Sequence, residues 1–412
     1  MALADRYDAI LLDLDGVLYR GDGAVAGAPE TVAELRRQGR SVVFLTNNSA
    51  RTPEQVADKL TGLGIEAAPA EVVTSAEATA QLLARDGDGT SAFVIGRDGI
   101  REALRGAGIR VTDGEEEAAA VVVGWDGSVT YEALRRATVL VRGGARLVAT
   151  NADASYPAPG GELWPGAGAI LAAVETASGQ RATVVGKPHR PLFDAALERA
   201  GSRNALMVGD RIETDIAGAA AAGIDAALVL TGAATAADLL DHDPLPAAVL
   251  EDVSALVADR DPAPARRADA TDMDAVRSVT DTPEDVPAWG PDGVWVIGDV
   301  AATATAEARG PDAYLRAVAT RPELRGTRQG TLAVAAAVGD ARRRGAAAAW
   351  LFTDTAEGFF AGLGFEPVDR AEVPEWIVQG PAEGCAVSAV AMRRALGQER
   401  RYGGDGSGRR AR

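Results

Sequence analysis

The sequence predicts an α/β protein with a parallel sheet that is interrupted by an inserted α/β module and followed by a separate α+β domain. Short apolar runs alternate with amphipathic stretches over residues 10–230, which is typical of successive β-α-β units. A length of 412 residues suits two or three domains. Residues 259–267 are rich in Asp, Pro, Ala and Arg without hydrophobic periodicity, as expected of a linker between domains.

Each predicted strand of the first part is a short Val-, Ile- or Leu-rich run, and each predicted helix is a longer stretch between two such runs. The first sheet opens with strands at 10–14, 41–46 and 71–74 and helices at 30–38 and 53–63. The inserted module has strands at 92–96, 119–124 and 146–151 and helices at 98–107 and 131–141. The first sheet resumes with strands at 183–186, 205–209 and 226–230 and helices from Pro191 and at 214–222.

These elements predict a discontinuous first domain, an insertion, a linker, a C-terminal domain and a tail. Their boundaries are 5–80 with 181–258, then 81–180, 259–267, 268–395 and 396–412. In the C-terminal domain we expect strands at 294–297, 314–320, 347–353 and 387–392 and helices at 331–344 and 356–363. The tail is rich in Gly and Arg and lacks apolar side chains, so we expect it to be disordered.

Composition excludes several classes of function. The chain has 42 Lys and Arg against 59 Asp and Glu, a net charge of −17 that disfavours binding to nucleic acid or anionic membranes. No apolar run approaches the roughly 20 residues needed to span a bilayer. The single cysteine, Cys385, and the absence of a signal-peptide pattern predict a cytoplasmic protein. With only two histidines, the chain cannot form a metal site from a cluster of histidines, and carboxylates must carry the function.

Polar residues follow two strands in the first half of the chain. Asp13 and Asp15 come directly after the first strand, and ligands of open α/β sheets bind beyond the carboxyl ends of strands. Two carboxylates this close require a cation or a shared proton, although a plain turn with Gly16 at positive φ is an alternative. Thr46 and Asn47 end another strand and offer uncharged groups to phosphate, or simply form a capping turn.

Two later segments end strands in the same way. Lys187 is one of only two lysines and follows a short strand; an exposed salt bridge is its alternative role. Asp210 and Asp215 lie five positions apart around the start of a helix, where one of them could be an N-cap.

Taken in order, these four segments resemble the motifs of the haloacid dehalogenase (HAD) superfamily, specifically its class IIA phosphatases related to 4-nitrophenylphosphatases and phosphoglycolate phosphatases. The inserted module resembles the large C2-type cap of that branch. The segments that carry the second resemblance are 124–126, 130–132, 149–153, 165–168 and 185–188. The resemblance covers about residues 5 to 258 and implies a Rossmann-like core with an inserted cap.

The resemblance also implies a mechanism. Asp13 would attack phosphorus to give an aspartyl-phosphate, Asp15 would serve as general acid and then general base, and Lys187 would offset charge on the phosphoryl oxygens. Mg²⁺ is the implied cofactor, since it prefers oxygen ligands. It would be held by the side chains of Asp13 and Asp210 and the backbone carbonyl of Asp15, with Asp215 supporting this shell indirectly.

Three further residues are implied to contact the substrate's phosphate: Thr46, Asn47 and Asn48. The organic part of the substrate would meet the cap. There the loop 151–156 is the candidate for specificity, with Tyr156 facing the pocket; a packed cap aromatic is the alternative role for Tyr156.

The C-terminal domain resembles the GNAT N-acetyltransferases over roughly residues 268 to 395. The segment 318–331 resembles their acetyl-CoA motif, in which backbone amides at a helix N-terminus hold pyrophosphate. Arg325 and Gly330 fit that motif, but Arg328 occupies its middle glycine position, and Phe360 stands where a proton-donating tyrosine often lies. These departures disfavour acetyl-CoA as a ligand and favour a structural or regulatory domain.

The combination of a C2-capped phosphatase with a GNAT-like domain resembles the actinobacterial glycerol 3-phosphate phosphatases. It implies Mg²⁺-dependent hydrolysis of a small phosphomonoester, glycerol 3-phosphate first and phosphoglycolate second. Acetyl transfer or acyl-CoA sensing by the C-terminal domain, and a noncatalytic scaffold, are the alternatives. The exact substrate and the oligomeric state stay open.

Overall fold

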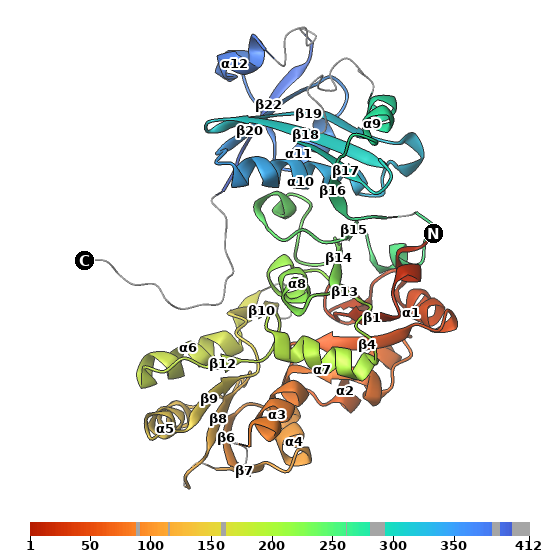
Figure 1. Cartoon of the computed structure of the whole chain (residues 1–412). Coiled ribbons are helices and arrows are strands. Elements are labelled where there is room, and N and C mark those ends of the chain that lie inside the picture. Colours follow the sequence, from red (N-terminus) through yellow and green to blue (C-terminus); the bar gives the residue numbers. More distant parts are fainter. Residues whose placement is uncertain are drawn as a thin grey trace, which may run out of the picture.

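The computed structural model of the chain describes residues 1–87, 91–113, 116–157, 162–260, 262–280, 293–380 and 388–397. Three sheets lie in a row: the C-terminal sheet at one end, a central sheet, and the sheet of the inserted module at the other end (Figure 1). The two sheets of the first 250 residues are parallel and the third is mixed. The predicted fold class is therefore confirmed.

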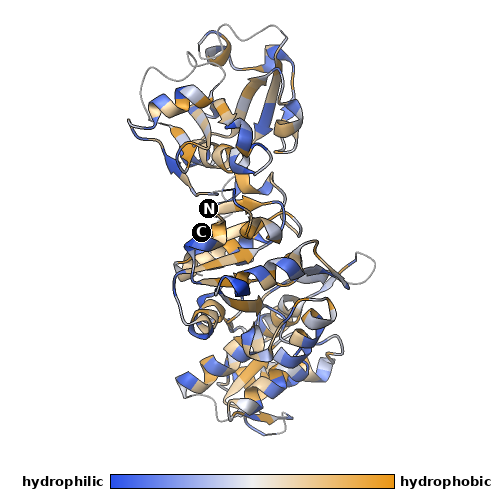
Figure 2. Ribbon diagram, turned by 90° about the vertical axis from the view of Figure 1, so that its right-hand side faces the viewer, coloured by the Kyte–Doolittle hydropathy of each residue, from blue (hydrophilic) through white to orange (hydrophobic). Residues whose placement is uncertain are grey.

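The central sheet has the strand order β15-β14-β13-β1-β4-β5, and every pair in it is parallel. Its strands are β1 (Ala9–Leu12), β4 (Ser41–Thr46), β5 (Val72–Thr74), β13 (Ala205–Gly209), β14 (Asp225–Val229) and β15 (Ala248–Leu250). The helices around it are α1 (Ala28–Arg37), α2 (Pro53–Gly62), α3 (Ser75–Asp86), α7 (Arg190–Ala200) and α8 (Ala217–Ala222). The strands are apolar on both faces because helices cover both, and Figure 2 shows them as hydrophobic ribbons inside the molecule.

Local chemistry decides where two of these helices begin. Thr52 caps α2, its hydroxyl accepting a hydrogen bond from the amide of Gln55 at 3.3 Å, and Pro53 follows at the first helical position. Thr74 caps α3 in the same way through the amide of Glu77 at 3.1 Å. Helix α3 therefore starts directly after strand β5, and helix α2 starts after the loop that follows strand β4.

The inserted module, called the cap below, has the strand order β12-β9-β8-β6-β7. Its strands are β6 (Ser91–Ile95), β7 (Arg110–Thr112), β8 (Ala120–Val123), β9 (Arg146–Ala149) and β12 (Thr183–Val184). Strand β12 was expected in the first sheet, but it pairs with β9 and belongs to the cap sheet. Helices α5 (Tyr131–Arg142) and α6 (Ala167–Ser178) pack on one face of this sheet, and α4 (Asp98–Gly106) lies on the other beside α3. A hairpin of β10 (Ser155–Pro157) and β11 (Leu163–Pro165) projects from the cap.

The C-terminal sheet has the order β16-β17-β18-β19-β20-β22-β21. Its strands are β16 (Ala265–Arg267), β17 (Val294–Ile297), β18 (Ala302–Arg309), β19 (Asp312–Thr320), β20 (Ala348–Thr353), β21 (Glu366–Pro367) and β22 (Val390–Ala395). Its helices are α9 (Met273–Val279), α10 (Gln329–Arg343), α11 (Glu357–Ala361) and α12 (Glu375–Val378). A short hairpin of β2 (Tyr19–Arg20) and β3 (Gly23–Ala24) completes the strands. Among the described residues, no helix combines the length and apolarity that crossing a membrane requires.

Two expectations for the C-terminal half were wrong. The predicted linker 259–267 ends in strand β16, which pairs with β17, so the sheet begins at Ala265. Strand β18 was not predicted, because its sequence of alternating Ala and Thr lacks the large β-branched side chains that mark strands. The predicted disorder of 398–412 and the start of the strand expected at 387 lie outside the described residues.

Helix α10 joins the C-terminal sheet to the central sheet. It is buried along nearly its whole length, with β17 to β19 on one side and β15 and the short helix η5 (Asp238–Asp241) on the other. Polar contacts frame this interface. Arg342 donates to the carbonyl oxygen of Leu240 at 3.1 Å, and Arg394 pairs with Asp241 at 2.7 Å and donates to the carbonyl oxygen of Ala237 at 3.1 Å. The two parts of the chain therefore share one continuous core.

We expect Arg394→Gln to lower the free energy of unfolding by about 1 to 3 kcal/mol, because a largely buried guanidinium loses a carboxylate and its carbonyl partners. Denaturant titration followed by circular dichroism measures the change. Arg393→Gln is the matched control, since Arg393 is exposed on the same strand and its guanidinium lies over the ring of Trp350. Equal stability of wild type and Arg394→Gln would contradict the proposed role of this contact.

Candidate active site

Three adjacent parallel strands place the predicted acidic and hydroxyl residues at one edge of the central sheet. In β1, Leu12 is in register with Phe44 of β4 and Val208 of β13. Asp13 follows β1 directly, Thr46 ends β4 and Asp210 follows β13. The backbone amide of Asp13 continues the ladder by donating to Val208 at 2.9 Å. These side chains therefore meet because their strands end side by side.

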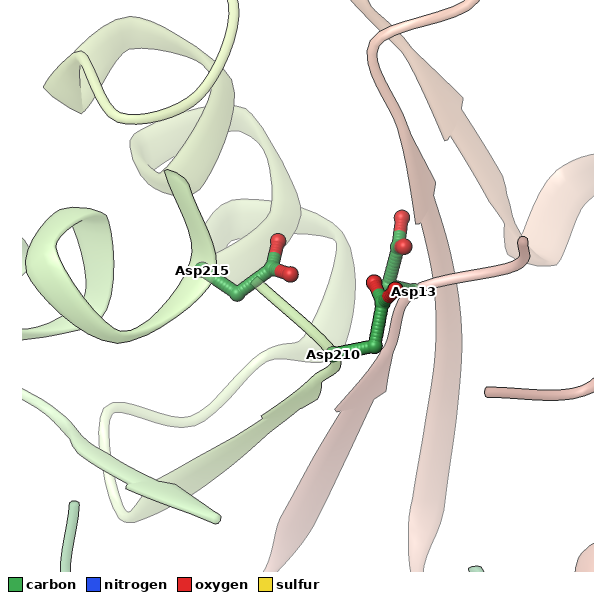
Figure 3. Close-up of side chains that lie close together, drawn as sticks. All are labelled: Asp13, Asp210 and Asp215. Atoms are coloured by element: carbon green, nitrogen blue, oxygen red, sulfur yellow. The ribbon is translucent and has the colours of Figure 1, made fainter. Parts of the chain in front are cut away.

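Three carboxylates gather there. One oxygen from each of Asp13, Asp210 and Asp215 lies within 4.8 Å of the others. Figure 3 shows Asp13 and Asp210 at the ends of neighbouring strands, with Asp215 approaching from the helical turn that follows β13. Asp215 is fully buried, and the backbone amide of Arg211 donates to its Oδ2 at 3.0 Å. The cluster combines two buried carboxylates at strand ends with a third that is held from behind by a backbone amide.

Lys187 compensates this negative charge. Its Nζ lies 2.5 Å from Oδ1 of Asp13 and 2.7 Å from Oδ1 of Asp215, and its side chain is only 4% exposed. Both carboxylates raise the pKa of Lys187 despite the opposing effect of burial, so the ammonium stays charged. Lys187 therefore forms buried ion pairs with two carboxylates, and not the exposed salt bridge that was its alternative role.

Burial disfavours the ionised forms of two of the carboxyl groups. It raises the pKa of Asp13 to about 8; Lys187 lowers that pKa, whereas the charges of Asp215 and Asp210 add to the rise. Burial, with the charge of Asp215, also raises the pKa of Asp210 to about 6. Oδ1 of Asp210 is buried and has no hydrogen-bond partner among the described residues. An unpartnered carboxylate oxygen among acids suits a divalent cation.

Asp15 differs from Asp13 in being exposed, so its carboxyl group is accessible to a substrate and to water. Gly16, directly after Asp15, turns the chain with φ of 81°, as the turn interpretation expected. A Cβ atom on Gly16 would lie 2.4 Å from Oδ2 of Asp210, so the close approach of this turn to Asp210 depends on glycine.

The second lysine also lies at this edge, which sequence reasoning missed. Nζ of Lys59 lies 3.5 Å from the ring centroid of Tyr19, and Tyr19 forms an isolated bridge with Asp15. Only two of the 42 basic residues are lysines. That bias is the signal that could have identified Lys59.

The side-chain amide of Asn47 forms hydrogen bonds with other residues of the protein, so it is not available to bind phosphate. Its Oδ1 accepts from the backbone amide of Lys187 at 2.7 Å, and its Nδ2 donates to the carbonyl oxygen of Lys187 at 3.1 Å and to Asp153 at 3.2 Å. Its carbonyl oxygen accepts from Asn151 at 2.8 Å and Ser75 at 2.7 Å. Asn47 thus connects the core, the cap and the lysine segment.

Its neighbours behave differently. Thr46 is buried, and its hydroxyl accepts from the amide of Asn48 at 3.1 Å, which leaves the hydroxyl proton available. Asn48 is exposed, and its Oδ1 accepts from the amide of Ala50 at 2.9 Å, so its side chain shapes the turn. Thr46 keeps the arrangement expected for phosphate contact better than either asparagine side chain.

Asp153 lies in the candidate specificity loop 151–156, but the sequence analysis did not single it out within that loop. Burial raises its pKa, and the hydrogen bond from Asn47 lowers it. The hydrogen bond joins Asp153 to Asn47, which lies 106 residues away in the sequence. No local motif could reveal that contact.

Tyr156 lies on the cap hairpin. Its ring meets Trp125 at a centroid distance of 5.4 Å and Trp164 at 6.3 Å, both nearly edge-to-face. Trp164 is 47% exposed and Leu163 is 71% exposed. These contacts fit the alternative of a packed cap aromatic, within a hairpin that presents apolar side chains to solvent.

Models of known families match both halves of the chain. A haloacid dehalogenase-like hydrolase model matches residues 10–110, and a HAD-hydrolase-like model matches residues 184–256. An acetyltransferase (GNAT) family model matches residues 256–365. Both resemblances expected from the sequence are confirmed.

Individual proteins agree with these families. The acid sugar phosphatase of Staphylococcus haemolyticus is 38% identical over 256 residues, which is 62% of this chain and 97% of that protein. The thermostable NPPase of Geobacillus stearothermophilus is 38% identical, with a TM-score of 0.56, over 62% of this chain and 98% of its own. The magnesium complex of a Mycobacterium tuberculosis glycerol phosphate phosphatase is 30% identical, with a TM-score of 0.66, over 83% of this chain and 93% of its own. This last match extends into the C-terminal part.

We expect divalent-cation binding to release protons and to tighten as pH rises. Without a cation, the raised pKa values of Asp13 and Asp210 favour their protonated forms, whereas a bound cation needs them ionised. The apparent Kd for Mg²⁺ should therefore fall between about pH 5 and about pH 8, by up to about tenfold per pH unit for each proton displaced. Calorimetric titrations in buffers of different ionisation enthalpy measure both effects.

Asp58→Asn is the control for this titration, because Asp58 is exposed on α2. It should release as many protons as the wild type. A Kd that is independent of pH, with no dependence on the buffer, would count against the assignment of these two carboxylates.

Proposed function

The chain belongs to the haloacid dehalogenase-like hydrolases and is a phosphatase, and we propose that it hydrolyses glycerol 3-phosphate in a Mg²⁺-dependent reaction through a phosphorylated Asp13. The observation that carries this proposal is the contact of Asp13 with Lys187 beside Asp210 at the carboxyl edge of the central sheet. A carboxylate nucleophile, a fixed cation and an acidic cation site are what phosphoryl transfer requires.

In the proposed first step, Asp13 attacks phosphorus in line and the ester oxygen leaves. Asp15 donates a proton to that oxygen, for which its exposed position two residues along the chain is suited. In the second step, Asp15 accepts a proton from the water that attacks the aspartyl-phosphate. Phosphate is released and both carboxyl groups return to their starting states.

The residues present fit a Mg²⁺ ion. Asp13 and Asp210 would hold it through side-chain oxygens and Asp15 through its carbonyl oxygen, while the bond from Arg211 fixes Asp215 behind them. When bound, Mg²⁺ supplies positive charge that lets a phosphate dianion approach the acids. The unpartnered Oδ1 of Asp210 supports this assignment.

Lys187 has a second part in the proposed reaction. Its ammonium is already held between Asp13 and Asp215, so it needs no rearrangement to lie beside the transferring phosphoryl group. Thr46 would donate its free hydroxyl proton to a phosphoryl oxygen. Asn47 would contribute by positioning the backbone of Lys187, since its amide group bonds both polar backbone atoms of that residue.

We prefer glycerol 3-phosphate to phosphoglycolate as the substrate because this chain is similar to a known glycerol phosphate phosphatase. The match to the mycobacterial glycerol phosphate phosphatase covers 83% of this chain, including the cap and much of the C-terminal part. The cap aromatics Trp125 and Tyr156 and the carboxylate of Asp153 offer no cation for the carboxylate of phosphoglycolate. A neutral polyol suits such a surface better.

The C-terminal domain is proposed to be structural rather than an acetyltransferase. At the N-terminus of α10, where pyrophosphate would bind, Glu251 of the central domain forms a forked pair with Arg328 at 2.5 and 3.1 Å. Gln329 is 4% exposed there, and the adjoining cavity between the two parts has a volume of about 10 Å³. That space holds at most about one water molecule. A carboxylate of the protein thus takes the place of an anionic ligand.

We expect Asp13→Asn to lower kcat by at least about 10³-fold, because the amide cannot act as the nucleophile. A phosphate-release assay over glycerol 3-phosphate, phosphoglycolate and sugar phosphates, with and without Mg²⁺, measures it. Asp58→Asn should match wild type. Mass spectrometry of enzyme quenched during turnover should find phosphate on Asp13, and label on another residue would refute the mechanism. Preference for phosphoglycolate would refute only the substrate.

We expect acetyl-CoA to show no saturable heat in a calorimetric titration of the full chain. Its pyrophosphate would have to displace Glu251 and open a joint with almost no free volume. Coenzyme A serves as the comparison ligand. Saturable binding of either compound, lost on Arg325→Ala, would instead support an acyl-CoA sensor.

A further inference from the structure

A second hollow lies in the cap, away from the catalytic edge. It has a volume of about 680 Å³ and opens beside β7, where that short strand ends and leaves β6 without a partner on that side. Phe93, Ile95 and Thr112 of the sheet line it together with Ala133 and Arg136 of α5 and Arg101 of α4. We call it the cap groove. Its lining contains none of the proposed catalytic residues.

Two arginines give the cap groove its charge. Arg101 donates to the carbonyl oxygens of Gly96 at 3.1 Å and Val94 at 2.9 Å, and Arg136 donates to that of Glu116 at 3.2 Å. Within the part of the chain that the structure describes, neither guanidinium forms an ion pair with a carboxylate. Both are half-buried. Carbonyl oxygens fix their positions without neutralising them, which favours an anion in the groove.

Three acidic residues also line the groove: Asp113, Asp126 and Glu132. Glu132 forms a forked pair with Arg135, and Asp126 accepts from the amide and hydroxyl of Ser128 at 2.9 and 2.7 Å. The hydrogen bond from Arg135 lowers the pKa of Glu132, and the charge of Arg136 adds to that effect without a direct ion pair. Among the described residues, Arg101 and Arg136 are therefore the lining arginines whose guanidinium groups contact carbonyl oxygens instead of carboxylates.

Unpaired polar atoms provide an independent observation. Thr112 is only 6% exposed, lines the groove, and has a hydroxyl with no hydrogen-bond partner among the described residues. Nε of Arg136 is also buried without a partner there. Buried polar groups are normally hydrogen-bonded, so two orphaned groups in one hollow point to a missing ligand.

The groove also offers carbon surface to the body of a ligand. The floor of the groove is formed by Phe93 and Ile95, and Ala133 and Val129 contribute further carbon surface. Pockets for small organic molecules combine such a surface with a few fixed polar groups. A bare inorganic ion would leave this surface uncovered.

The groove is connected to the cap surface that carries Tyr156. The segment 125–130 lines the groove with Asp126, Ser128 and Thr130, while its first residue, Trp125, packs against the ring of Tyr156. A ligand that contacts this segment therefore touches a support of the proposed specificity loop. Binding at one place would change affinity at the other by the same factor.

We propose that the cap groove binds a small organic anion, an apolar body with one carboxylate or sulfonate group, and that this binding is coupled to substrate binding through residues 125–130. The anion contacts Arg101 and Arg136, and the body lies on Phe93 and Ile95. The site is separate from the catalytic carboxylates, so it functions as an effector site of the phosphatase.

The test uses 8-anilinonaphthalene-1-sulfonate, an aromatic sulfonate whose fluorescence rises in apolar surroundings, with the full chain. Wild type should bind one equivalent saturably. Arg101→Gln combined with Arg136→Gln should raise the Kd at least about tenfold, because two charge-assisted hydrogen bonds are lost. Arg105→Gln is the matched control, since Arg105 is exposed on α4 and does not line the groove, and its Kd should stay within about twofold of wild type.

Ala133→Phe is a second variant that fills the groove without changing charge, and it should also weaken binding at least about tenfold. Circular dichroism melting checks that each variant is folded. Absence of saturable binding to wild type, or an equal Kd in wild type, the double variant and Ala133→Phe, would overturn the site.

The coupling is tested with p-nitrophenyl phosphate, so that the result does not depend on the natural substrate. Saturating sulfonate should change KM by at least about twofold in wild type and not in the Arg101→Gln, Arg136→Gln double variant, whose KM and kcat without the probe should equal those of wild type. An unchanged KM in wild type would overturn the coupling. A change of equal size in the double variant would show that the probe acts at the catalytic site instead.

Discussion

The buried contact of Lys187 with Asp13 and Asp215 is the interaction on which the arrangement of the site depends. Three carboxylates with oxygens within 4.8 Å repel one another strongly where water is excluded. The ammonium between two of them relieves this repulsion, and an orphaned oxygen of Asp210 remains for a cation. The site is thus electrostatically incomplete by one or two positive charges, which is the condition for attracting both a metal ion and, after it, a phosphate dianion.

The position of that lysine depends in turn on the junction between core and cap. Gly186 donates to the carbonyl oxygen of Thr150 at 2.9 Å, and a Cβ atom on Gly186 would lie 2.5 Å from that oxygen and 2.6 Å from Oδ1 of Asn47. Asn47 holds the backbone of Lys187 and also bonds Asp153 of the cap. Any movement of the cap is therefore transmitted to the residue that balances the charge of the nucleophile.

Features that depend on neighbouring residues in the sequence were predicted, whereas most contacts between residues far apart in the sequence were not. Strand β4 was predicted with the residues it has, because an apolar run and the capped helix after it are local signals. The meeting of Asp13, Thr46 and Asp210 follows from the common direction of parallel strands. The contacts of Asn47 with Asp153 and of Lys59 with Tyr19 depend on loops and helices brought together only by the fold. Strand β18 was missed because its pairing partners, and not its Ala and Thr residues, make it a strand.

Helix α10 has a further consequence for how this polypeptide can diverge. Its alanines let one layer of small side chains serve two neighbours at once, the C-terminal sheet and the central domain. A bulkier residue on either side of this helix would force the opposite partner to adjust, since interiors are close-packed. The two parts must consequently evolve together. Recombination that replaced only one of them would leave helix α10 packed against a surface that does not fit it.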